Sequence, residues 1–132
     1  CFEDVFPESA RRMALASADV LVNFTNDAWY LDSSAQYQHL VFSQFRALEN
    51  RRTLLRATNT GITAAINPHG RVDDILEPFK DGYLLYNFKV ETFDSYFTKH
   101  GDRWAFYVAI LCGLVFLYAV VKCKLGPVKV EF

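Results

Sequence analysis

The first four residues, Cys1-Phe2-Glu3-Asp4, place a thiol directly before an aromatic side chain and two acidic side chains. A thiol becomes a nucleophile when a base, a cation or a helix N-terminus favours the thiolate. A helix that starts near Pro7 would supply the N-terminus, whereas Glu3 and Asp4 oppose formation of the thiolate. Activation of Cys1 therefore requires a base and a cation from outside this segment.

Residue chemistry leaves the function of Cys1 open. The thiol is a lipid attachment point, an N-terminal nucleophile, or an internal active-site nucleophile that stands at the boundary of a fragment. A cysteine taken alone is also commonly an inert small hydrophobic residue.

Further polar candidates follow the apolar run at 19–25. Asn26, Asp27 and Trp29 stand just after a predicted strand, at the strand end where sites of α/β proteins usually form. Their side chains either face a substrate or only cap backbone groups of the loop. His39, early in a predicted helix, is interpreted as hydrogen-bonded structure. The sequence shows no metal-ligand spacing and no Gly-rich phosphate loop, so neither metal nor cofactor is expected.

The bulk composition excludes one class of partner and indicates another. The chain has 132 residues with 14 Lys+Arg against 15 Asp+Glu, so no basic field favours nucleic acid. Residues 104–121 carry no charge, and as a helix this stretch spans about 27 Å, close to the thickness of a bilayer core. Aromatic residues at both ends and Lys122, Lys124 and Lys129 beyond it predict a transmembrane helix with a cytoplasmic tail.

The remaining patterns predict a layered α/β domain. Helices are expected at 7–18 and 34–51, the second amphipathic, with Tyr37, Val41, Phe45 and Leu48 at helical spacing and Ser33 and Gln36 as a capping box. Strand 19–25 is expected to be buried on both faces. Further strands are expected at 53–58, 62–66, 71–76 and 83–91. The domain is expected to lack a first strand that would end at Cys1.

Several motifs together resemble one family. "CFEDVFPESARR", "ADVLVNFTNDAWYLDSSAQYQH", "RALENRRTLLRATNTGITAAINPHGRV" and the "GDRW" before the apolar span resemble the C-terminal portion of the apolipoprotein N-acyltransferases. These are integral membrane enzymes of the nitrilase, or carbon–nitrogen hydrolase, superfamily. The resemblance runs from Cys1 to about Val121. It implies the C-terminal half of a nitrilase-like αββα sandwich followed by one transmembrane helix.

The resemblance also implies a Glu–Lys–Cys triad that works by ping-pong chemistry. Cys1 matches the nucleophile, and Glu3 matches an acidic residue that helps order the site. Phe2 stands where relatives commonly have tyrosine or tryptophan, so it keeps the aromatic wall without the hydroxyl. The glutamate base and the oxyanion-stabilising lysine lie upstream in the family, so this chain is expected to be inactive alone.

Other site residues follow from the same resemblance. The loop with Asn26, Asp27 and Trp29 is expected to border the active-site cavity and, with Phe2, to bind substrate. Leu31 replaces a glycine of the family's usual motif, so the local turn is expected to differ. Arg46 and Glu49 are expected to form a structural polar network similar to that of nitrilase relatives. From their residue types alone, Asn59 and Gly61 are expected to shape a turn.

The implied reaction moves an acyl chain from a membrane phospholipid through a cysteine thioester to the N-terminal amine of the diacylglyceryl-cysteine of an apolipoprotein. The implied partners are the phospholipid donor, the apolipoprotein acceptor and the lipid bilayer. The resemblance places the protein in the bacterial cytoplasmic (inner) membrane as a monomer, with the catalytic domain facing the periplasm or outside. The expected divisions are a partial catalytic domain at 1–98, a connector at 99–103, the span at 104–121 and a tail at 122–132.

Two alternatives remain open from the sequence. A membrane-anchored nitrilase-type amidase would use the same nucleophile with water as the acceptor. A non-catalytic lipoprotein would instead carry lipid on Cys1 itself. The apolar residues Phe2, Val5 and Phe6 disfavour the lipoprotein, because mature lipoproteins usually begin with a flexible polar tether.

Overall fold

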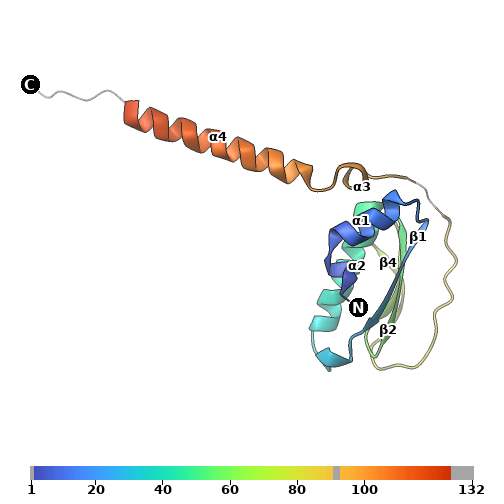
Figure 1. Ribbon diagram of the computed structural model, residues 1–132. Coiled ribbons are helices and arrows are strands. Elements are labelled where there is room, and N and C mark those ends of the chain that lie inside the picture. Colours follow the sequence, from blue (N-terminus) through green and yellow to red (C-terminus); the bar gives the residue numbers. More distant parts are fainter. Residues whose placement is uncertain (1, 91–92, 126–132) are drawn as a thin grey trace, which may run out of the picture. The chain divides into compact units, whose positions relative to one another are not determined.

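The computed structural model describes residues 2–90 and 93–125, and the chain divides into two compact units (Figure 1). The first unit, Cys1–Gly101, contains a four-stranded sheet and the helices that cover it. The second unit, Asp102–Phe132, contains one long helix. The α/β class predicted from the alternating patterns is confirmed.

The sheet has the strand order β1-β2-β3-β4, with β1 at Val20–Asn26, β2 at Thr53–Asn59, β3 at Thr63–Ile66 and β4 at Val72–Leu76. β1 runs parallel to β2, and the other neighbours are antiparallel. A parallel pair requires a long crossover, whereas antiparallel strands need only tight turns. The order of the strands therefore follows from the long connection before β2 and the short turns after it.

Helices α1 (Pro7–Leu15) and α2 (Ala35–Asn50) lie beside each other on one side of the sheet (Figure 1). α1 begins at a proline, which costs nothing there because the first amides of a helix have no intrahelical partner. α2 is the crossover that connects β1 to β2. The short helices η1 (Glu3–Val5), η2 (Ala28–Tyr30) and α3 (Tyr96–His100) complete the unit.

The core lies between these helices and the sheet. Its buried side chains are small or branched, with no large aromatic ring among them: Ala10, Leu21, Leu40, Ala47, Leu54, Ile62, Ala64 and Ile66. Small residues on the facing surfaces let the helices approach the sheet closely. The close approach brings polar groups of the helices within reach of polar groups of the strands.

Helix α2 turns its apolar stripe away from the core. An amphipathic helix ordinarily buries such a stripe, but Tyr37, Val41, Phe45 and Leu48 are all exposed. The buried side is mainly polar: Gln36, His39, Leu40, Ser43, Arg46, Ala47 and Asn50. The charged residues of η1 and β2 explain this orientation, because buried charges require hydrogen-bond partners that an apolar face cannot provide.

The expectation that strand 19–25 is buried on both faces is wrong. β1 stands at the edge of the sheet and alternates, with Leu21 and Thr25 buried while Val22 and Phe24 are 54% and 73% exposed. The helices cover the face that Leu21 occupies. On the opposite face, a hollow of about 590 Å³ lies between the sheet and residues 82–86. Within the described residues, helices therefore cover only one face of the sheet.

The predicted strand at 83–91 is also wrong for residues 83–90, which form no strand; residue 91 lies outside the described part. Tyr83 and Leu85 are 81% and 82% exposed. A strand exists only where a neighbouring strand completes its hydrogen-bond ladder. Apolar alternation alone does not supply that neighbour.

The second predicted helix is confirmed, but its capping box is wrong. Ser34, not Ser33, precedes the first helical residue, and its side chain makes no cap hydrogen bond. The side-chain amide of Gln36 instead donates to the carbonyl of Leu31 at 2.6 Å. The side chain of Gln36 thus bonds to the loop before the helix and does not form a capping box.

Helix α4 (Arg103–Leu125) contains an apolar stretch, Arg103–Lys124, with a mean hydropathy of 2.3. None of that stretch is buried within the protein. By length and composition it is able to cross a bilayer, in agreement with the span predicted at 104–121. Cys112 and Cys123 are free, exposed thiols on this helix.

Asp73 of β4 is the centre of a small exposed cluster of polar side chains. The hydroxyl of Tyr86 donates to Asp73 at 2.7 Å, and this bond, followed by those from Arg71 and Asn67, lowers the pKa of the Asp73 carboxyl. The substitution Tyr86→Phe removes the largest cause, so the pKa of Asp73 is expected to rise. A carboxyl ¹³C NMR titration of the whole chain in detergent micelles measures it.

Because the pKa of Asp73 is lowered in the folded chain, the contribution of this carboxyl to stability depends on pH. The stabilisation from Asp73 is present above the unfolded pKa of the group and is lost as the pH falls through the folded pKa. The Tyr86→Phe protein should lose that stabilisation at a higher pH than the parent. Tyr83→Phe on the same segment is the control, and an unchanged Asp73 titration in Tyr86→Phe would contradict the prediction.

Candidate functional site

Four predicted substrate contacts line one cavity of about 250 Å³: Phe2, Asn26, Asp27 and Trp29, together with Thr25, Tyr30 and His39. The cavity stands at the carboxyl end of β1, where Asn26 closes the strand and η2 follows. The loop after β1 was predicted at a strand end, and the structure confirms that position. Phe2, from the N-terminal segment, lies at the same cavity.

Aromatic rings form most of the wall. Phe2 stacks on His39 with ring centroids 5.4 Å apart, and Tyr30 meets the same imidazole edge-on at 6.0 Å. The indole of Trp29 is 85% exposed at the rim. The cavity therefore offers apolar and aromatic surface with a charged or polar floor, an arrangement suited to a ligand with both an apolar and a polar part.

Asn26 shapes the loop rather than the floor of the cavity. Its Oδ1 accepts a hydrogen bond from the amide of Ala28 at 3.1 Å. This is an Asx turn, in which the side chain replaces a backbone acceptor and starts the helical turn of η2. The turn sets the direction in which Trp29 projects.

Asp27 is fully buried, and both of its carboxylate oxygens have protein partners. Oδ1 lies 2.8 Å from His39 Nδ1 and accepts from the Thr25 hydroxyl at 3.4 Å. Oδ2 accepts from Arg56 Nη2 at 2.9 Å. Asp27 thus orders the floor of the cavity, and its hydrogen-bonding capacity is mostly used within the protein.

Asp4 repeats this pattern from the other side. Its Oδ1 lies 2.9 Å from His39 Nε2, and its Oδ2 accepts from Arg56 Nη1 at 2.7 Å and from the Ser43 hydroxyl at 2.7 Å. We refer to Asp4, Asp27, His39 and Arg56 as the buried charge cluster. Each of the four side chains is at most 3% exposed.

The buried charge cluster was not predicted from the sequence. Asp4 was expected only to oppose the thiolate of Cys1, and no function was expected of Arg56. A signal was present, because Arg56 interrupts the apolar strand "TLLRAT", and an arginine in a buried strand requires an acidic partner. The identity of the partners is not visible in sequence, because Asp4 and Asp27 come from distant segments.

The missing side chain of Gly61 leaves the space that the Asp27 carboxylate occupies. Asn26 of β1 pairs in register with Asn59 of β2, so the loops after these parallel strands meet. A Cβ atom on Gly61 would lie 2.5 Å from Asp27 Oδ2 and 2.7 Å from Asp27 Cβ. The turn-shaping function expected of Gly61 therefore includes this close approach, which only glycine permits.

The substitution Gly61→Ala is expected to displace Asp27 and lower the free energy of unfolding by about 1–3 kcal/mol, the usual cost of overpacking. Urea unfolding of the chain in detergent micelles, followed by tryptophan fluorescence, measures the change. Gly82→Ala is the control, because its nearest contacts are the ends of the Leu76 side chain at 3.3 Å. Equal unfolding midpoints for Gly61→Ala and the parent chain would contradict the prediction.

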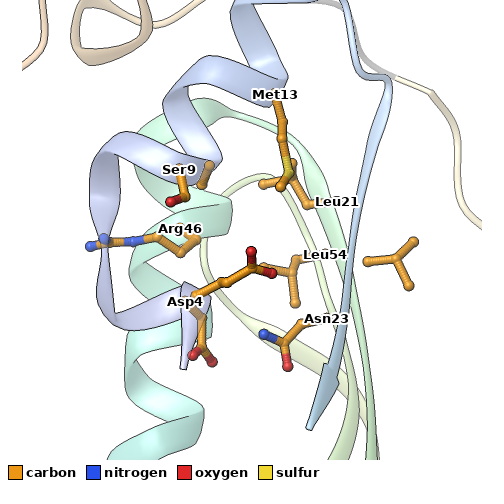
Figure 2. A pocket seen from close by; sticks show the side chains of 10 residues that line it. Asp4, Ser9, Met13, Leu21, Asn23, Arg46 and Leu54 are labelled. Carbon is orange, nitrogen blue, oxygen red and sulfur yellow. The ribbon is translucent and has the colours of Figure 1, made fainter. Parts of the chain in front are cut away.

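Glu3 lines a different and smaller cavity, of about 40 Å³. Figure 2 labels seven of the residues that line this cavity: Asp4 from η1, Ser9 and Met13 from α1, Leu21 and Asn23 from β1, Arg46 from α2 and Leu54 from β2. Asp4 connects the two cavities, because it lines this one and contacts His39 in the other. Cys1, the predicted nucleophile, lies outside the described residues.

Two structural expectations for helix α2 are confirmed. His39 is buried, and each of its ring nitrogens lies within hydrogen-bond distance of a carboxylate oxygen. Arg46 and Glu49 form an ion pair, with Nη2 and Oε2 3.0 Å apart. Neither finding requires that these residues take part directly in chemistry.

Comparisons with known proteins point to one family. The carbon–nitrogen hydrolase family model matches residues 1–96. The apolipoprotein N-acyltransferase of Borreliella burgdorferi is 46% identical over 105 residues, which cover 79% of this chain and 20% of that protein. The apolipoprotein N-acyltransferase of Pseudomonas syringae pv. tomato is 37% identical over 126 residues, which cover 96% of this chain and 24% of that protein.

A solved structure supports the fold. The carbon–nitrogen hydrolase from Helicobacter pylori G27 superposes with a TM-score of 0.51 at 18% identity, over 61% of this chain and 36% of that chain. The chain spans only a fifth to a quarter of the length of the curated relatives just described. The mixed sheet with helices on one face is thus shared with a hydrolase of this kind.

Proposed function

Because the chain belongs to the carbon–nitrogen hydrolase family, we propose that it is the C-terminal part of an apolipoprotein N-acyltransferase. The similarity to the Pseudomonas syringae relative carries this proposal. It covers 126 residues, whereas the hydrolase family model ends at residue 96. The similarity therefore extends into the apolar helix α4, which a hydrolase domain by itself does not require.

Cys1 is the proposed nucleophile. Its thiolate attacks the ester carbonyl of a membrane phospholipid, the lysophospholipid alcohol leaves with a proton, and a thioester remains on the enzyme. The free α-amine of a diacylglyceryl-cysteine then attacks the thioester and releases the thiol. A glutamate base and a lysine that stabilises the oxyanion come from residues upstream of Cys1.

The aromatic cavity supports a lipid substrate. Phe2 and Trp29 offer apolar surface to an acyl chain, while Asn26 and Asp27 fix the loop that carries Trp29. Glu3 orders the approach to Cys1 from the neighbouring small cavity. In this proposal Asp27 acts through the shape of the cavity and not by direct contact with the reacting atoms.

Helix α4 supports a membrane location, since both substrates are embedded in lipid. We place residues 104–121 in the bilayer of the bacterial cytoplasmic membrane, with 122–132 as the cytoplasmic tail. The partial catalytic domain at 1–98 then faces the periplasm or outside, and the connector at 99–103 joins it to the span. The lysines after the span favour this orientation.

The proposal is tested with the intact protein and with this chain alone. The intact protein, reconstituted in phospholipid vesicles with a diacylglyceryl-cysteine peptide, is expected to add one acyl chain to the peptide, measured by mass spectrometry. The isolated chain is expected to transfer none, because it lacks the base and the oxyanion stabiliser. Release of free fatty acid or ammonia without acylated peptide would instead indicate a hydrolase, and acyl transfer by the isolated chain would contradict the assignment of the missing residues.

A further inference from the structure

The imidazole of His39 lies between two carboxylates. Nδ1 is 2.8 Å from Asp27 Oδ1, and Nε2 is 2.9 Å from Asp4 Oδ1. A neutral imidazole has one N–H, so one of these contacts would set a nitrogen lone pair against an oxygen lone pair. Both contacts are hydrogen bonds when the ring carries a proton on each nitrogen.

With both carboxyls ionised, the charges of the cluster balance when the ring is an imidazolium. Arg56 donates to Asp4 at 2.7 Å and to Asp27 at 2.9 Å, so each carboxyl accepts a hydrogen bond from a cationic donor. Two carboxylates and one guanidinium leave a net negative charge in a buried site, and an imidazolium at His39 cancels it. Buried charges persist only when they are paired in this way.

The other groups that face the ring do not supply a competing charge. Phe2 stacks on it and Tyr30 meets it edge-on. Ser43 and Thr25 donate hydroxyl hydrogen bonds to the two carboxylates. Among the described residues, the ionisable groups placed around His39 are Asp4 in η1, Asp27 after β1, Arg56 in β2 and the phenol of Tyr30.

The position of the ring between two segments gives it a use. Asp4 belongs to the N-terminal segment that begins with Cys1, and Asp27 belongs to the loop that carries Trp29. We propose that His39 is an imidazolium bridge that fixes these two segments relative to each other, so that it is a positioning residue for acyl transfer. The positioning function rests on the proposed acyltransferase activity, whereas the protonated state does not.

The protonated state is tested on this chain in detergent micelles. ¹⁵N NMR of the imidazole nitrogens near neutral pH is expected to show both nitrogens of His39 at the similar shifts of a doubly protonated ring. The substitution His39→Gln assigns the signals by their loss. One nitrogen shifted far downfield, as in a neutral ring, would overturn the bridge whether or not the protein is an acyltransferase.

The positioning function is tested on the intact enzyme. His39→Gln is expected to lower kcat for formation of the acyl-enzyme by about 100-fold, the loss that a small misplacement of reacting groups produces. KM for the phospholipid donor is expected to change much less. His69→Gln, the same change at an exposed histidine, is the matched control and should leave both constants unchanged.

Stability separates positioning from folding alone. His39→Gln leaves one uncompensated negative charge, and the double variant His39→Gln with Asp27→Asn restores the balance, so its unfolding midpoint should exceed that of the single variant. A folded His39→Gln enzyme that forms the acyl-enzyme at the parent rate would overturn the positioning function. An inactive parent enzyme would contradict the acyltransferase proposal. The NMR measurement would still decide whether His39 is doubly protonated.

Discussion

Cys1→Ser in the intact protein is expected to abolish the acyl-enzyme. A serine hydroxyl is far less acidic than a thiol, so the base that generates a thiolate leaves serine protonated and weakly nucleophilic. The measurement is incubation with radiolabelled phospholipid, followed by treatment with neutral hydroxylamine, which cleaves thioesters. The Cys1→Ser protein should carry no radiolabel that hydroxylamine can release.

Cys123→Ser provides the matched control, because Cys123 is a free, exposed thiol on α4. It should accumulate the thioester as the parent does. A Cys1→Ser protein that still carries hydroxylamine-sensitive label would show that the nucleophile is a different residue. Loss of label in the Cys123→Ser protein would contradict the assignment equally.

Arg56→Met is expected to lower the free energy of unfolding by about 3–5 kcal/mol, the usual loss when one member of a buried ion pair is removed. The guanidinium is fully buried and contacts both Asp4 and Asp27. Methionine fills much of the same volume but leaves two buried carboxylates with only His39 between them. Since a domain is stable by about 5–15 kcal/mol, this change removes a large part of the margin.

Chemical unfolding of the chain in detergent micelles, followed by near-ultraviolet circular dichroism, measures the effect. Arg12→Met is the control, because Arg12 pairs with Glu8 on the surface and its side chain is 78% exposed. Surface pairs contribute about 0–1 kcal/mol, so the control should unfold close to the parent. Equal losses in the two variants would show that the buried charge cluster does not support the fold.

Periodicity in the sequence predicted the elements whose pattern is local. Helix α2, strands β1 to β4 and the apolar helix α4 all appear close to their expected ranges. A helix or strand of this kind depends mainly on side chains near one another in sequence, so the pattern is sufficient. The loop with Asn26 and Trp29 could also be assigned to the end of a strand for this reason.

The orientation of α2 could not be predicted from the same pattern. The stripe with Tyr37 and Phe45 satisfies the usual rule for a buried face, yet His39 faces inward. The usual rule considers only apolar area. The inward face of α2 must also provide polar partners for the buried charges of Asp4 in η1 and Arg56 in β2. Those partners lie far away in sequence, so only the folded chain reveals the competition.

The strand predicted at 83–91 failed for a related reason. Alternation at Tyr83 and Leu85 indicates a preference, but a strand also requires a neighbour with free backbone groups. The described residues supply none to this segment. Preference is a local property, whereas pairing is a property of the whole sheet.

The α/β class and the apolar helix α4 could be predicted from the sequence, and its motifs resemble those of the apolipoprotein N-acyltransferases. Only the folded chain shows that Asp4 and Asp27 hold His39 between them and that Arg56 donates to both carboxylates. Element type follows from short-range patterns of polarity. A buried charge cluster depends on the distances between segments that meet only after folding, and its stability depends on those distances through the electrostatic cost of leaving any one charge unpaired.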